Sequence, residues 1–235
     1  MKAFNLLFVV LLLAGCQTPG LEKTGLTSSG FQVEDVAKGD IDQVAEVTLH
    51  QSRAYLQLLA DKLYRRNPDQ LKIGGYSAGR EQVVSWLMGE PPSALKAQWQ
   101  GKRAAELINL GFDEHYPGDR VATLVYGLRT MLTDAYGGEQ AFYLGHQYDP
   151  QKIYHLARNI EIAAWRLKSV RDVSGRPVLL SVGRDDHGVL NTSFERLVGK
   201  LVALHDHFAQ VVADTGGRRI KNVIQSVASA VFFPI

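Results

Sequence analysis

From residue 40 onward, apolar residues recur every three or four positions, which is the spacing of a helix with one buried face. The first such segment begins at Asp40, which forms a capping-box pattern with Gln43, and it ends at the Arg-Arg-Asn-Pro sequence of 65–68. Shorter helices are predicted over 80–88 and over 93–110. The first half of the domain is therefore predicted to be helical.

The second half of the chain follows the same pattern, with one exception. Helices are predicted, in order, from Asp119 to Tyr136, from Asp149 to about Leu167, from Ser193 to about Ala213 and from Ile220 to Val231. The exception is Pro177–Val182, which fits a strand or an extended loop, and one strand makes no sheet. Gly101 is unfavourable inside the 93–110 helix. The predicted fold class is all-α, a single globular domain of about six or seven helices over 40–235 after a flexible tether.

The composition is that of a folded protein. Of the 235 residues, 46% are hydrophobic and 21% are charged, which excludes wholesale disorder. The 26 Lys and Arg residues nearly balance the 24 Asp and Glu residues and form no basic stripe, so no nucleic-acid partner is expected. The single cysteine, Cys16, cannot form an internal disulfide, and no Cys/His set has zinc spacing. We expect no metal and no cofactor.

The first 16 residues, MKAFNLLFVVLLLAGC, have the order of an export signal. A cation at Lys2 precedes an apolar run over 6–13, and two small residues separate that run from Cys16. The run is shorter than the roughly 20 apolar residues that cross a bilayer. The sequence Leu13-Ala14-Gly15-Cys16 resembles the lipobox of bacterial lipoprotein precursors.

This resemblance implies that Cys16 is acylated and that the signal peptide, residues 1–15, is removed. Each buried methylene contributes about 0.8 kcal/mol, so two or three acyl chains would attach the protein to the bilayer almost permanently. Gln17 stands where aspartate would imply retention in the inner membrane, so the resemblance implies an outer-membrane anchor with the body facing the periplasm. Residues 16–39, rich in Gly, Ser and Thr, are predicted to be the lipidated cysteine and its flexible tether.

The chain has no GxxxxGK[ST] phosphate-binding pattern and no H-E-x-x-H zinc pattern. Ser93 and Lys96 match S-x-x-K by letters. A serine that follows two prolines is typical of a helix cap, however, and the lysine is then expected on the solvent face. Three acid and histidine clusters remain, at 113–115, 185–187 and 205–207.

Carboxylates and imidazoles can hold a metal or share acid–base work where their side chains converge. His205 and His207 point about 200° apart on one helix, so they are not expected to bind one ion. Asp185, Asp186 and His187 have the composition of a loop, for which a solvated turn is the alternative. They form the weak candidate site of the sequence.

Two groups of aromatic residues are candidates for an interface. The final residues, 232–235, are all apolar and would favour aggregation unless they dock somewhere. Phe232 and Phe233 are therefore predicted either to pack on the chain's own core or to contact a partner or a bilayer. Tyr136 and Tyr143 lie near a Gly-Gly connection, where they can line an interface or pack in the core.

Together these patterns favour a non-enzymatic role. The leading hypothesis is an outer-membrane-anchored periplasmic lipoprotein, a scaffold or accessory component of a cell-envelope assembly such as a secretion, pilus or cell-wall system. Its expected partners are the bilayer, through acylated Cys16, and an envelope protein. The alternatives are a metal-assisted periplasmic hydrolase that uses the 184–187 loop and a carrier of an apolar ligand between helices.

Overall fold

The computed structural model describes residues 39–138, 146–183, 188, 190–217 and 231–235. All of them belong to one compact unit, Gln32–Ile235. The predicted Ile220–Val231 helix lies almost wholly outside the described residues, as do Cys16 and most of the tether.

The predicted all-α fold is confirmed. The described part of the chain contains α2 (Asp40–Arg66), α3 (Asp69–Ile73), α4 (Arg80–Met88), α5 (Ser93–Gln98), α6 (Ala104–Phe112), α7 (Arg120–Ala135), α8 (Pro150–Ser169) and α9 (Ser193–Thr215).

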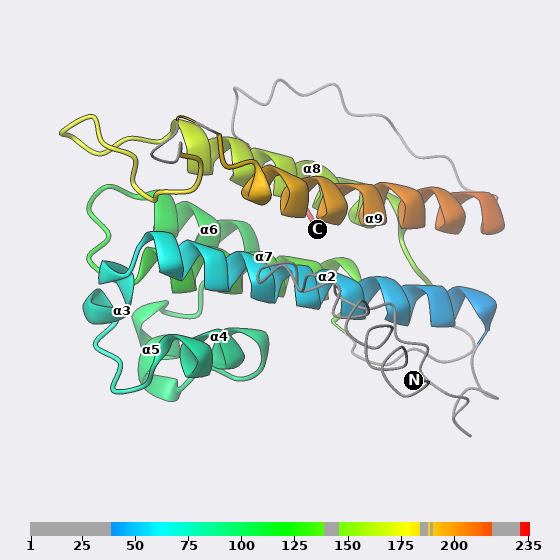
Figure 1. The fold of residues 1–235 in the computed structure, drawn as a ribbon. Helices are drawn as coiled ribbons and strands as arrows, with labels where there is room; N and C mark the ends of the chain where they lie inside the picture. The colour runs from blue at the N-terminus through cyan, green and yellow to red at the C-terminus, as the bar shows by residue number, and fades with distance from the viewer. Residues whose placement is uncertain (1–38, 139–145, 184–187, 189, 218–230) are drawn as a thin grey trace, which may run out of the picture. The chain divides into compact units, whose positions relative to one another are not determined.

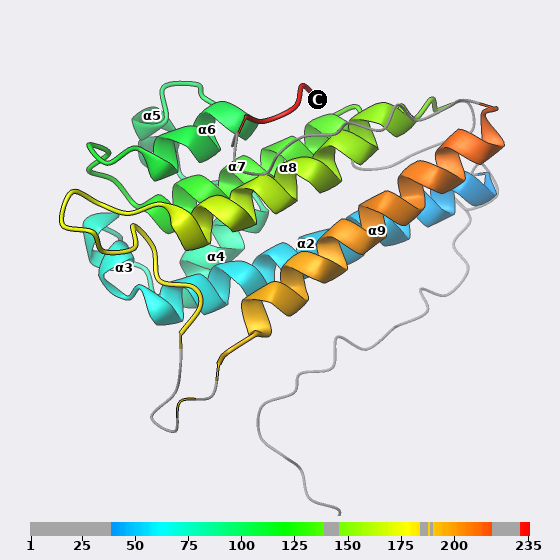
Figure 2. The same cartoon turned by 90° about the horizontal axis from the view of Figure 1, so that it is seen from above.

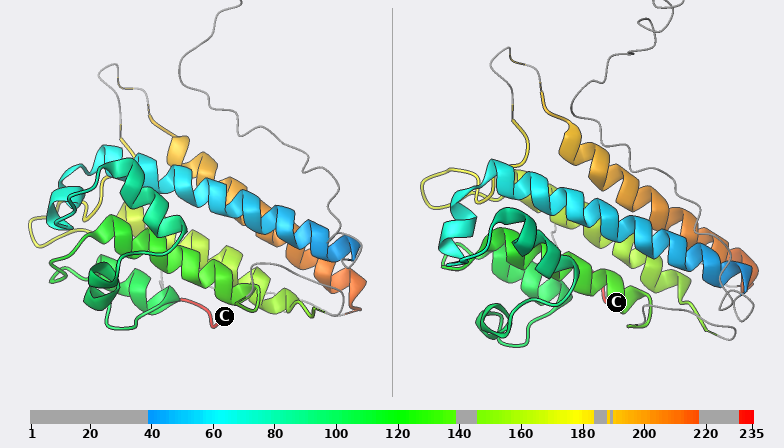
Figure 3. Two further views of the ribbon diagram at one scale, coloured as in Figure 1. Left: turned by 90° about the horizontal axis from the view of Figure 1, so that it is seen from below. Right: turned by 60° about the horizontal axis from the view of Figure 1, so that its bottom comes forward.

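Four long helices form the centre of this unit. Helix α2 contacts α7 and α9, and α8 contacts the same two helices, so that the four enclose one core. Each is antiparallel to both neighbours (Figure 1 and Figure 2). The shorter α4 packs on α2 and α7, and α6 packs on α7 (Figure 3). The arrangement is that of an up-and-down four-helix bundle with small helices added at one end.

Cap chemistry explains where two of the helices begin. The Asp119 side chain accepts the Ala122 N–H at 2.9 Å at the start of α7, as predicted. The Asp149 side chain accepts the Gln151 N–H at 2.9 Å at the start of α8, and Pro150 occupies the first turn. These two predicted caps are confirmed, whereas the N-cap of α5 is Pro92, so the prediction that Ser93 caps that helix was wrong.

The first cap is displaced by one residue from its predicted place. Gly39 is the N-cap of α2, and its N–H donates to Asp42 Oδ2 at 3.0 Å, whereas Asp40 is the first helical residue. Asp42 is fixed from outside the helix as well, since the Tyr148 hydroxyl donates to its other oxygen at 2.8 Å. The acidic residue that caps α2 is therefore Asp42, which is also held by a tertiary contact with Tyr148.

The predicted 93–110 helix is two helices, and that prediction was wrong. Helix α5 ends at Gln98 and α6 begins at Ala104. The turn between them places Gly101 at φ +77° and also holds Gln100 at φ +52°. The indole of Trp99 is buried and donates to the Thr123 hydroxyl of α7 at 3.3 Å. The turn is therefore tied to the bundle at its first residue.

Residues 177–182 form an extended loop rather than a paired strand. The β-type pairing of this loop is a single isolated antiparallel bridge between Pro177 and Arg171. Asn67, at the end of α2, binds the backbone of Leu180 in both directions, donating to its carbonyl at 2.9 Å and accepting its N–H at 2.7 Å. This amide takes the place of a neighbouring strand.

Candidate functional site

The first acid and histidine cluster, 113–115, is a surface loop. Asp113 Oδ1 accepts the backbone N–H of His115 at 2.9 Å, and Glu114 Oε1 lies 3.1 Å from His115 Nε2. The His115 side chain is 84% exposed, so these groups face water rather than a closed pocket. Asp185, Asp186 and His187 lie outside the described residues, so their place relative to this loop stays a prediction.

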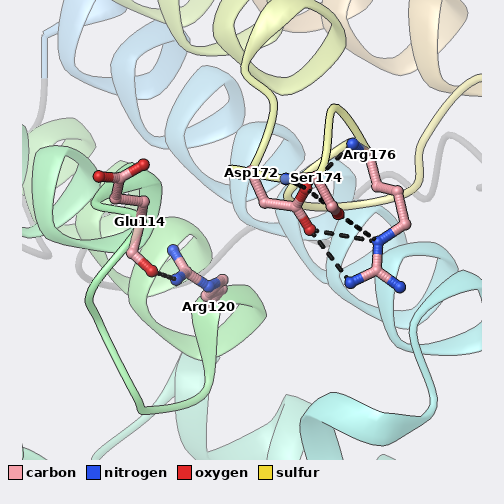
Figure 4. Close-up of polar contacts among 5 residues, drawn as sticks. All are labelled: Glu114, Arg120, Asp172, Ser174 and Arg176. Carbon is pink, nitrogen blue, oxygen red and sulfur yellow. Dashed lines mark hydrogen bonds and ion pairs between the residues drawn. The ribbon is translucent and has the colours of Figure 1, made fainter.

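Arg120 holds this loop by its backbone. Its guanidinium donates to the carbonyls of Gly111, Asp113, Glu114 and Tyr116. Figure 4 shows Arg120 between Glu114 and the turn that begins at Asp172. Because the guanidinium is occupied by carbonyl oxygens, its role here is to close the loop.

The turn beside Arg120 is self-contained. Asp172 accepts the Ser174 hydroxyl at 2.6 Å and the Arg176 N–H at 3.0 Å, and its other oxygen faces the Arg176 guanidinium (Figure 4). The hydrogen bond from Ser174 is the largest cause that lowers the pKa of Asp172 to about 2. The Asp172 carboxylate therefore stabilises the turn from Asp172 to Arg176.

A buried Ser–His–Tyr chain crosses the bundle core. His205, on α9, lies 3.2 Å from the Ser52 hydroxyl of α2 through Nε2 and 3.2 Å from the Tyr136 hydroxyl through Nδ1. Ser52 and His205 are fully buried, and Tyr136 is 1% exposed and stacks on Phe208. Of the alternatives for Tyr136, the structure therefore shows core packing, whereas Tyr143 lies outside the described residues. His207 is exposed, and the prediction that the two histidines diverge is confirmed.

The direction of these bonds argues against nucleophilic catalysis. The Ser52 hydroxyl also lies 2.7 Å from the Thr48 carbonyl, which can only accept. Ser52 therefore accepts from His205 Nε2–H, and Nδ1 accepts from Tyr136. Burial lowers the pKa of His205 to about 3, so the imidazole stays neutral. A catalytic base would need its free lone pair on Ser52, whereas here the proton is on that side.

A second buried polar group lies at the start of α7. Besides capping the helix, Asp119 accepts the Tyr64 hydroxyl at 2.6 Å. Burial is the largest cause that raises the pKa of Asp119. Thr123 accepts the Trp99 N–H and donates to the Asp119 carbonyl at 2.7 Å. These contacts join the turns at one end of the bundle.

Two cavities accompany these networks. The first has a volume of about 20 Å³ and lies between α2, α7, α8 and α9, with Leu59, Leu128 and Phe194 in its wall. It has room for about one water molecule. The second is an open cleft of about 430 Å³ beside α5 and α6, lined by Gln98, Gln100, Lys102 and Tyr116 among others. Its polar groups are amides, a hydroxyl and one ammonium.

The residues from 231 to 235, called the C-terminal segment below, dock on α8 (Figure 2). Asn159 binds the backbone of Phe233 in both directions. Its Nδ2 donates to the Phe233 carbonyl at 2.9 Å, and its Oδ1 accepts the Phe233 N–H at 2.7 Å. Asn159 is fully buried. Of the alternatives for Phe232 and Phe233, the structure therefore shows docking on the chain's own body.

Three further side chains of α8 complete this docking surface, which consists of Gln151, His155, Asn159 and Arg166. His155 Nδ1 donates to the Pro234 carbonyl at 2.9 Å, and its ring stacks on Phe233. Gln151 Nε2 lies 2.9 Å from His155 Nε2, which fixes the imidazole from behind.

Arg166 recognises the first aromatic residue of the segment. Its guanidinium carbon lies 5.6 Å from the centre of the Phe232 ring and 4.8 Å from that of Phe112, on α6. It also donates to the side-chain oxygen of Asn109. The cation is therefore held against two rings at once.

Comparison with known proteins adds no relative. No family model, curated protein or solved structure matches this chain.

The docking surface was not found from the sequence, although a signal was present. Gln151, His155 and Asn159 are four residues apart, so a helix places them in one polar row. In an amphipathic helix, a polar row beside the apolar stripe is the ordinary pattern of a solvent-exposed face. What it binds is 74 and 79 residues away in the sequence.

In the described part of the chain, no three His, Cys, Asp or Glu side chains come together in a way that could hold a metal ion. No helix of that part is long and apolar enough to cross a membrane.

Proposed function

We propose that this chain is an outer-membrane-anchored periplasmic lipoprotein whose helical body holds a component of a cell-envelope assembly. The observation that carries the proposal is the sequence Leu13-Ala14-Gly15-Cys16 after a basic start and a short apolar run. Acylation of that thiol, with Gln17 beside it, fastens the body to the periplasmic face of the outer membrane.

The tether sets the distance at which the body works. Residues 16–39 are 24 residues in the printed sequence. A flexible chain of this length spans roughly 25 Å between its ends. The body then stands clear of the lipid headgroups but stays within reach of a partner embedded in the same membrane.

A binding role is supported by what the buried polar groups do. The Ser52 and His205 pair is committed to a chain of hydrogen bonds between helices. Asp119 is committed to a helix cap and to Tyr64. Such satisfied networks make a fold rigid and unique. A rigid body on a tether is suited to presenting a surface.

In-cell crosslinking of the native chain and two matched variants tests the proposal. The native chain should be recovered with a stoichiometric envelope protein. Cys16→Ser removes the acyl acceptor, so the chain should leave the membrane fraction and the yield of that complex should fall severalfold. Gln17→Asp keeps the cysteine and serves as the control, since it should move the lipidated chain to the inner membrane. A native chain of normal abundance that repeatedly yields no partner would contradict the proposal.

A further inference from the structure

The docking surface on α8 has the features of a site that reads a peptide backbone. Asn159 pairs with both the N–H and the carbonyl of one residue, Phe233, at 2.7 and 2.9 Å. A neighbouring strand would make the same two contacts, and they do not depend on the side chain of the residue that is bound. With the segment in place Asn159 is fully buried, and both polar atoms of its amide are satisfied by the backbone of Phe233.

Side-chain contacts add selectivity around this backbone contact. His155 bonds the next carbonyl along, that of Pro234, and its ring stacks on Phe233 with the centres 5.0 Å apart. Arg166 faces the ring of Phe232. The surface thus selects two successive aromatic residues followed by proline in an extended chain.

The C-terminal segment is held more lightly than the helices. Val231 is 63% exposed and Pro234 is exposed, while Phe232 and Phe233 are only partly buried. Phe233 and Pro234 are hydrogen-bonded to side chains of α8, and Phe232 and Ile235 pack against the edge of the core. Segments with few buried contacts open locally at a lower cost than the global fold. This one can leave the surface while the bundle stays folded.

We infer that the docking surface on α8 is a peptide-binding site, and that it takes the C-terminal segment of a second copy of the chain in exchange for its own. The occupant is a second copy because its segment is identical to the one docked here, so it would remake every contact described above. Exchange of identical elements between protomers is an inexpensive route to a dimer. The segment makes the same contacts on its own chain and on a second copy. The balance between the monomer and the exchanged dimer therefore depends on the effective concentration of the segment at each surface.

Two complementary variants test this inference in the soluble body, independently of the membrane anchor. One chain is shortened to end at Ala230, so that it keeps the surface and lacks the segment. The other carries Asn159→Ala, so that it keeps the segment and lacks the central contact. Each alone should be monomeric, and an equimolar mixture should form a 1:1 complex by size-exclusion chromatography with light scattering. The control mixture contains Gln210→Ala, a change at an exposed amide on α9, in place of Asn159→Ala. This control chain keeps an intact docking surface, which binds the chain's own C-terminal segment, so the mixture should give less complex.

A measurement on the intact chain keeps the inference falsifiable if the shortened chain does not fold. The synthetic peptide Val-Phe-Phe-Pro-Ile should displace the segment, so hydrogen exchange at the Phe233 amide should accelerate with peptide concentration. A peptide of the same composition in scrambled order should have no effect. Asn159→Ala should weaken binding of the ordered peptide by about tenfold or more. An unchanged Phe233 exchange rate at saturating peptide, or the absence of complex from two folded variants, would overturn the inference.

Discussion

At the scale of single residues, the molecule places ionisable groups inside the bundle and uses them as hydrogen-bonding partners. The imidazole of His205 links α9 to Ser52 and to Tyr136, and it does so in its neutral form. Burial lowers its pKa to about 3 from the ordinary value of 6.5. This buried histidine makes stability depend on pH.

The sign of that dependence follows from the lowered pKa. In the unfolded chain His205 binds a proton below about pH 6.5, whereas in the folded chain it does so only near pH 3, so the unfolded state binds more protons in between. The stabilisation is fully present above pH 6.5 and is lost as the pH falls toward 3. Its size is on the order of 5 kcal/mol.

The variant His205→Gln tests this dependence. Glutamine can accept from Tyr136 and donate to Ser52 without titrating, so the free energy of unfolding should fall less steeply between pH 7 and pH 4 than in the native chain. Urea denaturation at several pH values measures the difference. His115→Gln, at an exposed histidine, should keep the native slope. Equal slopes for all three proteins would contradict the buried neutral imidazole.

At the scale of elements, local chemistry decides most boundaries and tertiary contacts decide the rest. Asp119 and Asp149 are caps because a carboxylate before a first turn finds free N–H groups there, and the sequence suffices to predict that. Gly101 is a local sign of the break in the 93–110 segment, whereas the burial of Trp99 against α7, which ties the turn to the bundle, is a contact that no local pattern contains.

The variant Gly101→Ala distinguishes the broken helix from the continuous one. In a continuous helix alanine would stabilise by roughly 1 kcal/mol. In the turn, where Gly101 adopts φ +77° and a Cβ would meet nothing within 4 Å, only the backbone strain counts. We therefore expect a loss of about 1 kcal/mol. Thermal and urea unfolding would measure it, and a stabilised variant would contradict the turn.

At the scale of the whole molecule, four long helices form a bundle, to which we propose that a lipid anchor is attached by a tether. The all-α class follows from the period of the apolar residues, which the core positions of the four long helices share. The docking surface could not be predicted, because Asn159 and Phe233 are 74 residues apart and the polar row on α8 has the pattern of a solvent face. Sequence periodicity shows which side of a helix is apolar, but it does not show which distant segment a polar side chain will bind.

The anchor is the claim on which the proposed function depends, and mass spectrometry of the protein extracted from its native membrane tests it most directly. We expect the mature chain to begin at Cys16, with residues 1–15 removed and the mass of two or three acyl chains on its first residue. A chain that retains Met1, or one whose Cys16 carries an unmodified thiol, would contradict the account.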